Sequence, residues 1–240
     1  MTFKFIKTVL TTCRYAMCIS LGVLSVSGTA SATLIESIAA LEEGAMYRVL
    51  FVTSGLTTAL SSDIVDYNTF VSTAAGSGSV TGSLGLTWKA LASTNDVDAQ
   101  ENTDIYNHDA KSVTMFNTRG QILAISGADL WNGTLANQLR YDENGSTVYI
   151  DNAFTGTNKD GSKSGATLGG QFVIVRTGDI GFYNAWIDSN DYEAPWNELP
   201  IYAASHAVVK PQADVPEPGT VILLSLGLAG LSFARYRKQF

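Results

Sequence analysis

Apolar and polar positions divide the chain of 240 residues into three regions with different patterns. Apolar runs cover residues 15–26 and 220–234, close to the two basic ends, whereas the middle region is polar with short apolar stretches. These stretches are rich in β-branched and aromatic residues and are separated by turn-forming Gly, Asn, Asp and Ser, which is typical of strands. The pattern indicates a targeting segment at each end and a folded body between them.

The middle region predicts one main helix. Apolar residues recur at a spacing of three to four over residues 64–74, which places them on one face of a helix. Ser-Ser-Asp at 61–63 supplies an N-cap and an acidic first turn, and Gly-Ser-Gly-Ser at 76–79 ends the segment. We therefore expect an amphipathic helix between these two signals.

The remaining apolar stretches predict several mostly antiparallel strands, with Trp88 as a core anchor. Residues 33–44 fit either a short helix or an irregular lead-in. Together these elements predict one α+β domain over residues 33–206 and a linker at 207–214. The expected strands are 47–54, 86–92, 113–116, 121–125, 147–150, 171–176, 185–188 and 201–204, with turns at 117–120, 130–133 and 141–145 and a polar loop at 154–165.

The N-terminus has the three parts of a secretory signal peptide. Lys4, Lys7 and Arg14 give the positive start, residues 15–26 give the apolar part, and Ala30-Ser31-Ala32 gives a small-residue cleavage site. We expect the secretion machinery to export the chain and cleavage to follow Ala32, so the signal peptide is 1–32. The alternative is a short buried helix, but no amphipathic pattern follows it.

The C-terminal apolar run predicts a membrane segment at about 220–234. Fifteen residues give about 22 Å of helix, somewhat less than the ~30 Å hydrocarbon core. Arg235, Arg237 and Lys238 follow it and favour a cytoplasmic end, which leaves the middle region outside. The alternative is a C-terminal core helix, but this helix would be apolar on every face.

The sequence Val215-Pro216-Glu217-Pro218-Gly219, the Leu/Gly/Ala-rich run and the basic end closely resemble a PEP-CTERM sorting signal over residues 215–240. The resemblance implies that an exosortase recognises Pro216, Glu217 and Pro218, that the anchor is then removed, and that the host makes exopolysaccharide or biofilm. The two prolines also hold this stretch extended, which suits a processing enzyme.

The middle region contains a series of short motifs, at 51–55, 61–71, 87–94, 129–133, 141–145, 154–161 and 199–202. These motifs resemble those of an exported PEP-CTERM group without an assigned activity and, more distantly, those of secreted domains with the C-type-lectin-like (endostatin-like) fold. Such domains usually carry cysteines near their last strands, where this chain has Pro195-Trp196 and Ala203-Ala204.

Cysteine usage and charge narrow the function further. Cys13 and Cys18 both lie in the predicted signal peptide, so the exported domain has no disulfide, thiolate metal site or cysteine nucleophile. Six of the 15 Lys and Arg residues lie outside residues 33–217, whereas all 22 Asp and Glu residues lie inside, so this region has a formal charge of −13. Such a charge repels nucleic acid and excludes it as a partner.

The sequence does not support an enzyme. His108 and His206 lie in polar segments, and the chain lacks the Gly-x-Ser-x-Gly motif of a serine hydrolase. Carboxylates at 188–198 offer pairs for glycoside hydrolysis, but nothing selects one pair. Acidic stretches at 95–104, 142–144 and 188–198 offer oxygen ligands for Ca²⁺, yet none has EF-hand spacing. We therefore expect no cofactor, with Ca²⁺ as the alternative, and no catalytic residues.

Aromatic residues in polar loops give the remaining lead. Trp196, Trp186 and Tyr192 are predicted to stack on sugars, against the alternative that such rings are core anchors. We expect a non-catalytic exopolysaccharide- or biofilm-associated protein, anchored transiently in the inner membrane and then delivered to the envelope or extracellular matrix. The alternatives are a secreted hydrolase of matrix polysaccharide and a permanently anchored single-span surface protein.

Overall fold

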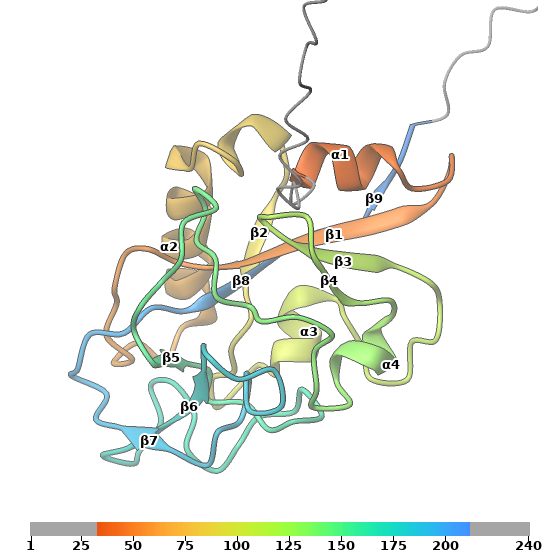
Figure 1. Ribbon diagram of the computed structural model, residues 1–240. Helices are drawn as coiled ribbons and strands as arrows, with labels where there is room; N and C mark the ends of the chain where they lie inside the picture. Colours follow the sequence, from red (N-terminus) through yellow and green to blue (C-terminus); the bar gives the residue numbers. More distant parts are fainter. Residues whose placement is uncertain (1–32, 212–240) are drawn as a thin grey trace, which may run out of the picture. The chain divides into compact units, whose positions relative to one another are not determined.

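A computed structural model of the protein describes residues 33–211, which fold around a mixed sheet (Figure 1). The strand order is β2-β8-β1-β3-β4, and β9 also pairs with β1. The pairing of β1 with β3 is parallel and the other pairings are antiparallel. These strands are β1 (Met46–Val52), β2 (Trp88–Ala90), β3 (Thr114–Asn117), β4 (Ile122–Ala124), β8 (Tyr202–Ser205) and β9 (Val208–Val209).

Strand β1 is the centre of the core because both of its faces are covered. Val49 and Phe51 belong to one apolar cluster, and Leu50 and Val52 belong to another. Successive side chains of a strand point to opposite faces, so a continuous apolar run is expected for a strand buried on both sides. The predictions of this strand, of the 113–125 hairpin and of the last strand are confirmed, with bounds shifted by one or two residues.

Helix α2 (Ile64–Ser77) covers one face of the sheet and confirms the predicted amphipathic helix. Asp63 is the N-cap, and its Oδ1 accepts a hydrogen bond of 2.9 Å from the Val65 N–H. Tyr67 and Val71 of the helix pack in the same apolar cluster as Phe51 of β1. The opposite face is covered by short helices and loops. The other helices are α1 (Leu34–Ala39), the 3₁₀ helix η1 (Gly82–Leu84), α3 (Ala99–Thr103) and α4 (Gly127–Leu130).

Side chains protect the free edge of β2. Ser72 Oγ donates to the Trp88 carbonyl at 3.1 Å, the Ala90 N–H donates to Asn68 Oδ1 at 2.8 Å, and Asn102 Nδ2 donates to the Ala90 carbonyl at 2.6 Å. An unpaired edge is a template for aggregation. Polar side chains of α2 and α3 therefore satisfy the backbone groups that a further strand would otherwise bind. Trp88 is buried, as predicted.

A second, three-stranded antiparallel sheet consists of β5 (Asn152–Phe154), β6 (Val175–Asp179) and β7 (Tyr192–Glu193). Three strand predictions fail here. Residues 147–150 contribute only an isolated bridge, the strand predicted at 171–176 begins at Val175, and residues 185–188 form no strand. Residues 185–188 are nevertheless packed tightly, because a Cβ at Gly178 would lie 1.8 Å from the Trp186 carbonyl oxygen.

The folded body extends past residue 206 into the segment predicted as a linker. Met46 pairs with Val209, and the Lys210 N–H donates to the Ala45 carbonyl at 2.8 Å. Lys210 Nζ also donates to the Ala39 carbonyl, at the end of α1, at 2.6 Å. The first and last described segments therefore meet, whereas β5–β7 lie at the other end of the view in Figure 1.

The targeting segments lie outside the described residues. These are the signal peptide at 1–32 and the sorting signal at 215–240, including the membrane segment predicted at 220–234. Between residues 33 and 211, no helix has the length and apolar character needed to span a bilayer.

Candidate functional site

Arg176 lies in β6 between two segments that hold its backbone. Its N–H donates to the Ala166 carbonyl at 2.9 Å, and its carbonyl accepts from the Thr155 N–H at 3.2 Å and the Gly156 N–H at 3.0 Å. The register of β6 and β7 places Arg176 directly opposite Tyr192. The backbone therefore fixes the starting point of the arginine side chain.

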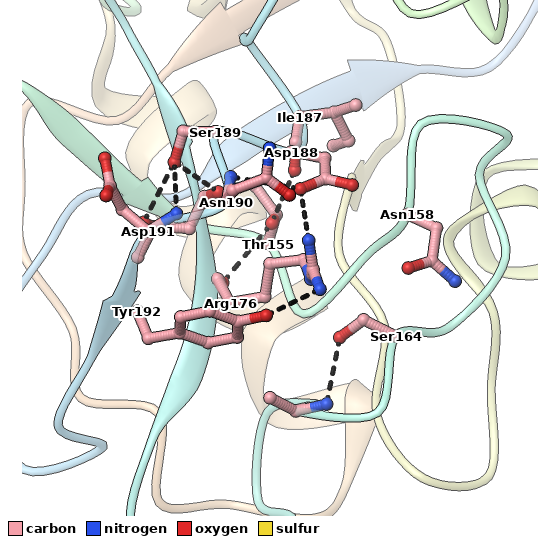
Figure 2. Close-up of polar contacts among 12 residues, drawn as sticks. Thr155, Asn158, Ser164, Arg176, Ile187, Asp188, Ser189, Asn190, Asp191 and Tyr192 are labelled. Atoms are coloured by element: carbon pink, nitrogen blue, oxygen red, sulfur yellow. Dashed lines mark hydrogen bonds and ion pairs between the residues drawn. The ribbon is translucent and has the colours of Figure 1, made fainter.

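The guanidinium group joins an acid and a phenol (Figure 2). Nη1 forms a hydrogen-bonded ion pair with Asp188 Oδ1, and Nη2 donates to the Tyr192 hydroxyl at 2.7 Å. The same Asp188 oxygen accepts from the Asn190 N–H at 3.2 Å. The side chains of Arg176 and Asp188 are only 15% and 11% exposed, so this pair is screened less than a surface ion pair. The hydrogen bond from Arg176 holds the Tyr192 ring in place.

The loop at 188–191 is anchored to the second sheet. Ser189 donates to the Thr177 carbonyl through both its N–H, at 3.0 Å, and its Oγ, at 2.9 Å. Thr155 Oγ1 donates to the Ile187 carbonyl at 2.8 Å. Asn190 has φ 63°, in the left-handed region that Asn tolerates better than most residues. The loop is therefore a defined part of the surface beside Arg176.

Tyr192 and Trp196, hereafter the aromatic pair, are 42% and 60% exposed. A tight turn separates them, in which Asn197 Nδ2 donates to Glu193 Oε2 at 2.8 Å and the Asn197 N–H donates to the Ala194 carbonyl at 3.0 Å. The Ala59 N–H ties this turn to the body through the Pro195 carbonyl at 2.8 Å. Two large rings are thus presented to solvent by a fixed turn.

Further exposed apolar side chains lie close in sequence to residues that contact this turn. Leu60 directly follows Ala59, whose N–H binds the Pro195 carbonyl. Residues 172–174 directly precede Val175, which pairs with Glu193. Leu60, Phe172 and Val173 are all at least 60% exposed. Exposed apolar side chains among polar ones are typical of interaction sites. The aromatic pair, the Arg176–Asp188 ion pair and these neighbours make up the candidate site.

The prediction that Trp186 stacks on sugars is wrong, because this residue is only 1% exposed. Its ring stacks on Trp131 with 6.0 Å between centroids and meets Tyr202 edge-on at 5.8 Å. The absence of a side chain at Gly178 lets the Trp186 backbone approach β6 closely. Of the three predicted stacking residues, the structure leaves Tyr192 and Trp196 accessible.

The acidic segments considered for calcium or catalysis have mostly structural contacts. Asp142 Oδ1 accepts the Asn144 and Ser146 N–H groups at 2.9 and 2.8 Å, as in an Asx turn. Glu143 binds the backbone N–H and hydroxyl of Ser54. In the part of the chain covered by the structure, no group of three or more His, Cys, Asp or Glu side chains is placed to hold a metal ion. Calcium binding stays a prediction.

The histidines and two groups with shifted pKa values, Arg48 and Tyr202, are not part of this site. His108 and His206 are exposed, and His206 Nδ1 accepts from the Thr87 N–H at 3.2 Å. Burial lowers the pKa of the Arg48 guanidinium and raises the pKa of the Tyr202 phenol well above its ordinary value. These two shifts belong to the core and concern stability.

Sequence reasoning missed Arg176. The arginine lies in a strand with its partner acid 12 residues away, beyond a loop whose path depends on Gly178. One usable signal was an arginine in an otherwise acidic domain, beside a segment rich in aromatic residues. That signal suggests a pair but does not identify Asp188 as the partner.

Comparison with known protein families identifies a motif at the C-terminal end of the chain. The family described as the PEP-CTERM protein-sorting motif matches residues 214–238. No curated protein sequence matches the chain significantly. The match includes Val215, Pro216, Glu217 and Pro218 and the basic residues up to Lys238, so the predicted resemblance to PEP-CTERM sorting signals is confirmed.

Proposed function

We propose that the folded body is a non-catalytic polysaccharide-binding protein of the cell envelope or extracellular matrix. The PEP-CTERM sorting motif implies that the chain is exported, anchored transiently in the membrane and processed by an exosortase. In this view the sorting signal delivers the protein, and the candidate site at β6–β7 binds the polymer. Delivery and binding then belong to separate parts of the chain.

The observation that carries the proposal is the exposed aromatic pair beside a fixed ion pair. Sugar rings have apolar C–H faces that pack on aromatic rings and hydroxyl groups that exchange hydrogen bonds with polar side chains. Trp196 and Tyr192 supply the rings, and Arg176, Asp188 and the exposed Asn190 supply polar groups. Most of these groups are held before the ligand arrives, which lowers the entropic cost of binding.

The contacts of two of the acids support the non-catalytic part of the proposal. A glycosidase needs two carboxyl groups across the scissile bond, one of which gives up a proton. Asp188 is occupied by Arg176 and the Asn190 N–H, and Glu193 is bound by Asn197. Release of reducing sugar from a bound polymer would favour the hydrolase alternative.

We also propose, by analogy of arrangement, a C-type-lectin-like fold for this chain. A main helix packs on a mixed sheet, and a long loop region with a small second sheet carries the candidate site. That likeness is an analogy of fold, so the argument for function rests on the residues of the site. The site lies at the opposite end of Figure 1 from α1 and β9, so binding is compatible with an anchor that follows Pro211.

The test is a titration of the purified protein with exopolysaccharide extracted from the producing cells. We expect binding by affinity electrophoresis and a change in tryptophan fluorescence. Trp196→Ala should weaken binding about tenfold or more, since removal of a central aromatic contact costs about 2 kcal/mol. Tyr149→Ala, which removes an 86% exposed ring from another loop, is the matched control and should bind normally. Equal binding by wild type and Trp196→Ala would refute the site.

A further inference from the structure

Charges around the aromatic pair are unbalanced toward negative. The cation that contacts Tyr192, Arg176, is neutralised by Asp188. Asp191 and Glu198 are exposed, and Glu193 is half-buried in the turn between the two rings. These three carboxylates have no cation partner within the site, so a ligand on the rings meets a net negative surface.

The loop at 154–165 carries two lysines, Lys159 and Lys163. Lys163 Nζ donates to the Asn95 carbonyl at 2.9 Å, so its ammonium group is bound to another segment. The aliphatic chain of Lys159 packs over Gly133, where a Cβ would lie 3.1 Å from its Cδ. The Lys163 ammonium is thus bound to another segment, and the folded body as a whole is acidic.

We propose that the candidate site selects uncharged polysaccharide and excludes polyuronates, an inference that rests on the proposed function. A uronate carboxylate stacked on either ring would lie within a Debye length of the three unpaired acids, where repulsion is not screened at low salt. Two like charges repel more strongly at a protein surface than in bulk water, because the effective dielectric constant is lower there. A polymer with one carboxylate per sugar meets this repulsion in every register.

Neutral sugars avoid that repulsion and use the same groups. Their hydroxyls can donate to the oxygens of Asp191 and Glu198, which form no side-chain hydrogen bonds within residues 33–211. Carboxylate acceptors form stronger hydrogen bonds than neutral ones. The same acids that exclude a polyanion therefore favour a polyhydroxyl chain.

The experiment compares polymers that differ only in charge. The probes are polygalacturonate with its fully methyl-esterified form, and a β-glucan with its C6-oxidised polyglucuronate, each titrated into the purified protein at 20 mM and 500 mM NaCl. We expect at least tenfold tighter binding of the uncharged member of a pair at low salt and less than threefold at high salt. The double variant Asp191→Asn/Glu198→Gln should lose most of the difference, whereas Asp151→Asn, an exposed acid on another loop, should keep it.

The outcomes separate the two proposals. Equal or tighter binding of the polyuronates at low salt would overturn the selectivity and leave polysaccharide binding in place. Selectivity that persists in the double variant would also overturn it, because the named acids would not be its cause. Absence of binding to both uncharged polymers and to the cells' own exopolysaccharide would overturn the proposed function, and the selectivity with it.

Discussion

Replacing the buried Arg48 with methionine should destabilise the fold strongly. Its guanidinium group donates to the Thr103 carbonyl at 2.9 Å, the Ser205 carbonyl at 2.8 Å and the Asp104 carbonyl at 2.7 Å. It thereby joins the end of α3 to β8 from a position in β1. Methionine keeps the aliphatic part of the side chain and removes these donors.

The expected loss follows from the carbonyls left behind. Thr103 and Ser205 are buried, and an unsatisfied buried acceptor costs about 1–3 kcal/mol. Asp104 is exposed, so water replaces the lost donor there. Burial of the guanidinium, which also lowers its pKa, offsets part of the gain in the wild type. We expect Arg48→Met to lower the free energy of unfolding by about 3 kcal/mol.

Urea unfolding followed by circular dichroism measures this loss. With a slope of about 2 kcal/mol per molar urea, the midpoint should fall by about 1.5 M at an unchanged slope. Lys89→Met removes an exposed cation from β2 and should change stability by less than about 0.5 kcal/mol. A loss below 1 kcal/mol for Arg48→Met would refute the view that this arginine satisfies the buried carbonyls.

Two further substitutions test the core beneath the site. Gly178→Ala should prevent folding or cost about 3 kcal/mol or more, because the new Cβ would meet the Trp186 carbonyl oxygen, whereas Gly165→Ala has open space and should be nearly neutral in thermal unfolding. Tyr202→Phe should be nearly neutral at pH 7. Because the pKa of Tyr202 is raised in the folded state, the free energy of unfolding of the wild type falls as the pH rises above about 10. Tyr202→Phe should reduce this fall when unfolding is measured from pH 9 to 11. An unchanged dependence of the free energy of unfolding on pH would contradict this cause.

The sequence predicts the parts of the fold in which local and tertiary signals agree. Helix α2 has both a cap and an apolar face, and β1 is a continuous apolar run because both its faces are buried. The bounds of β5 and β6 could not be predicted, since their pairing depends on contacts between loops distant in sequence. Strand β9 was missed for a related reason: two valines carry little signal until β1 offers an edge.

The candidate site shows the same division. Trp186 and Trp196 both follow a small or turn-forming residue in a polar segment, yet one is in the core and the other at the surface. The difference arises from the close approach at Gly178, which no local pattern records. Exposure of the aromatic pair and the Arg176–Asp188 ion pair are tertiary outcomes, so the sequence could supply only the residue types.

The most direct test of the account is the intact mass of the protein that co-purifies with extracellular polysaccharide from the producing cells. The account predicts a species that starts at Thr33, ends between Pro216 and Gly219, and is released from the polymer by competing uncharged glycan. A species that extends to Phe240, occurs only in the membrane fraction and is absent from the polymer would contradict both the processing and the proposed role.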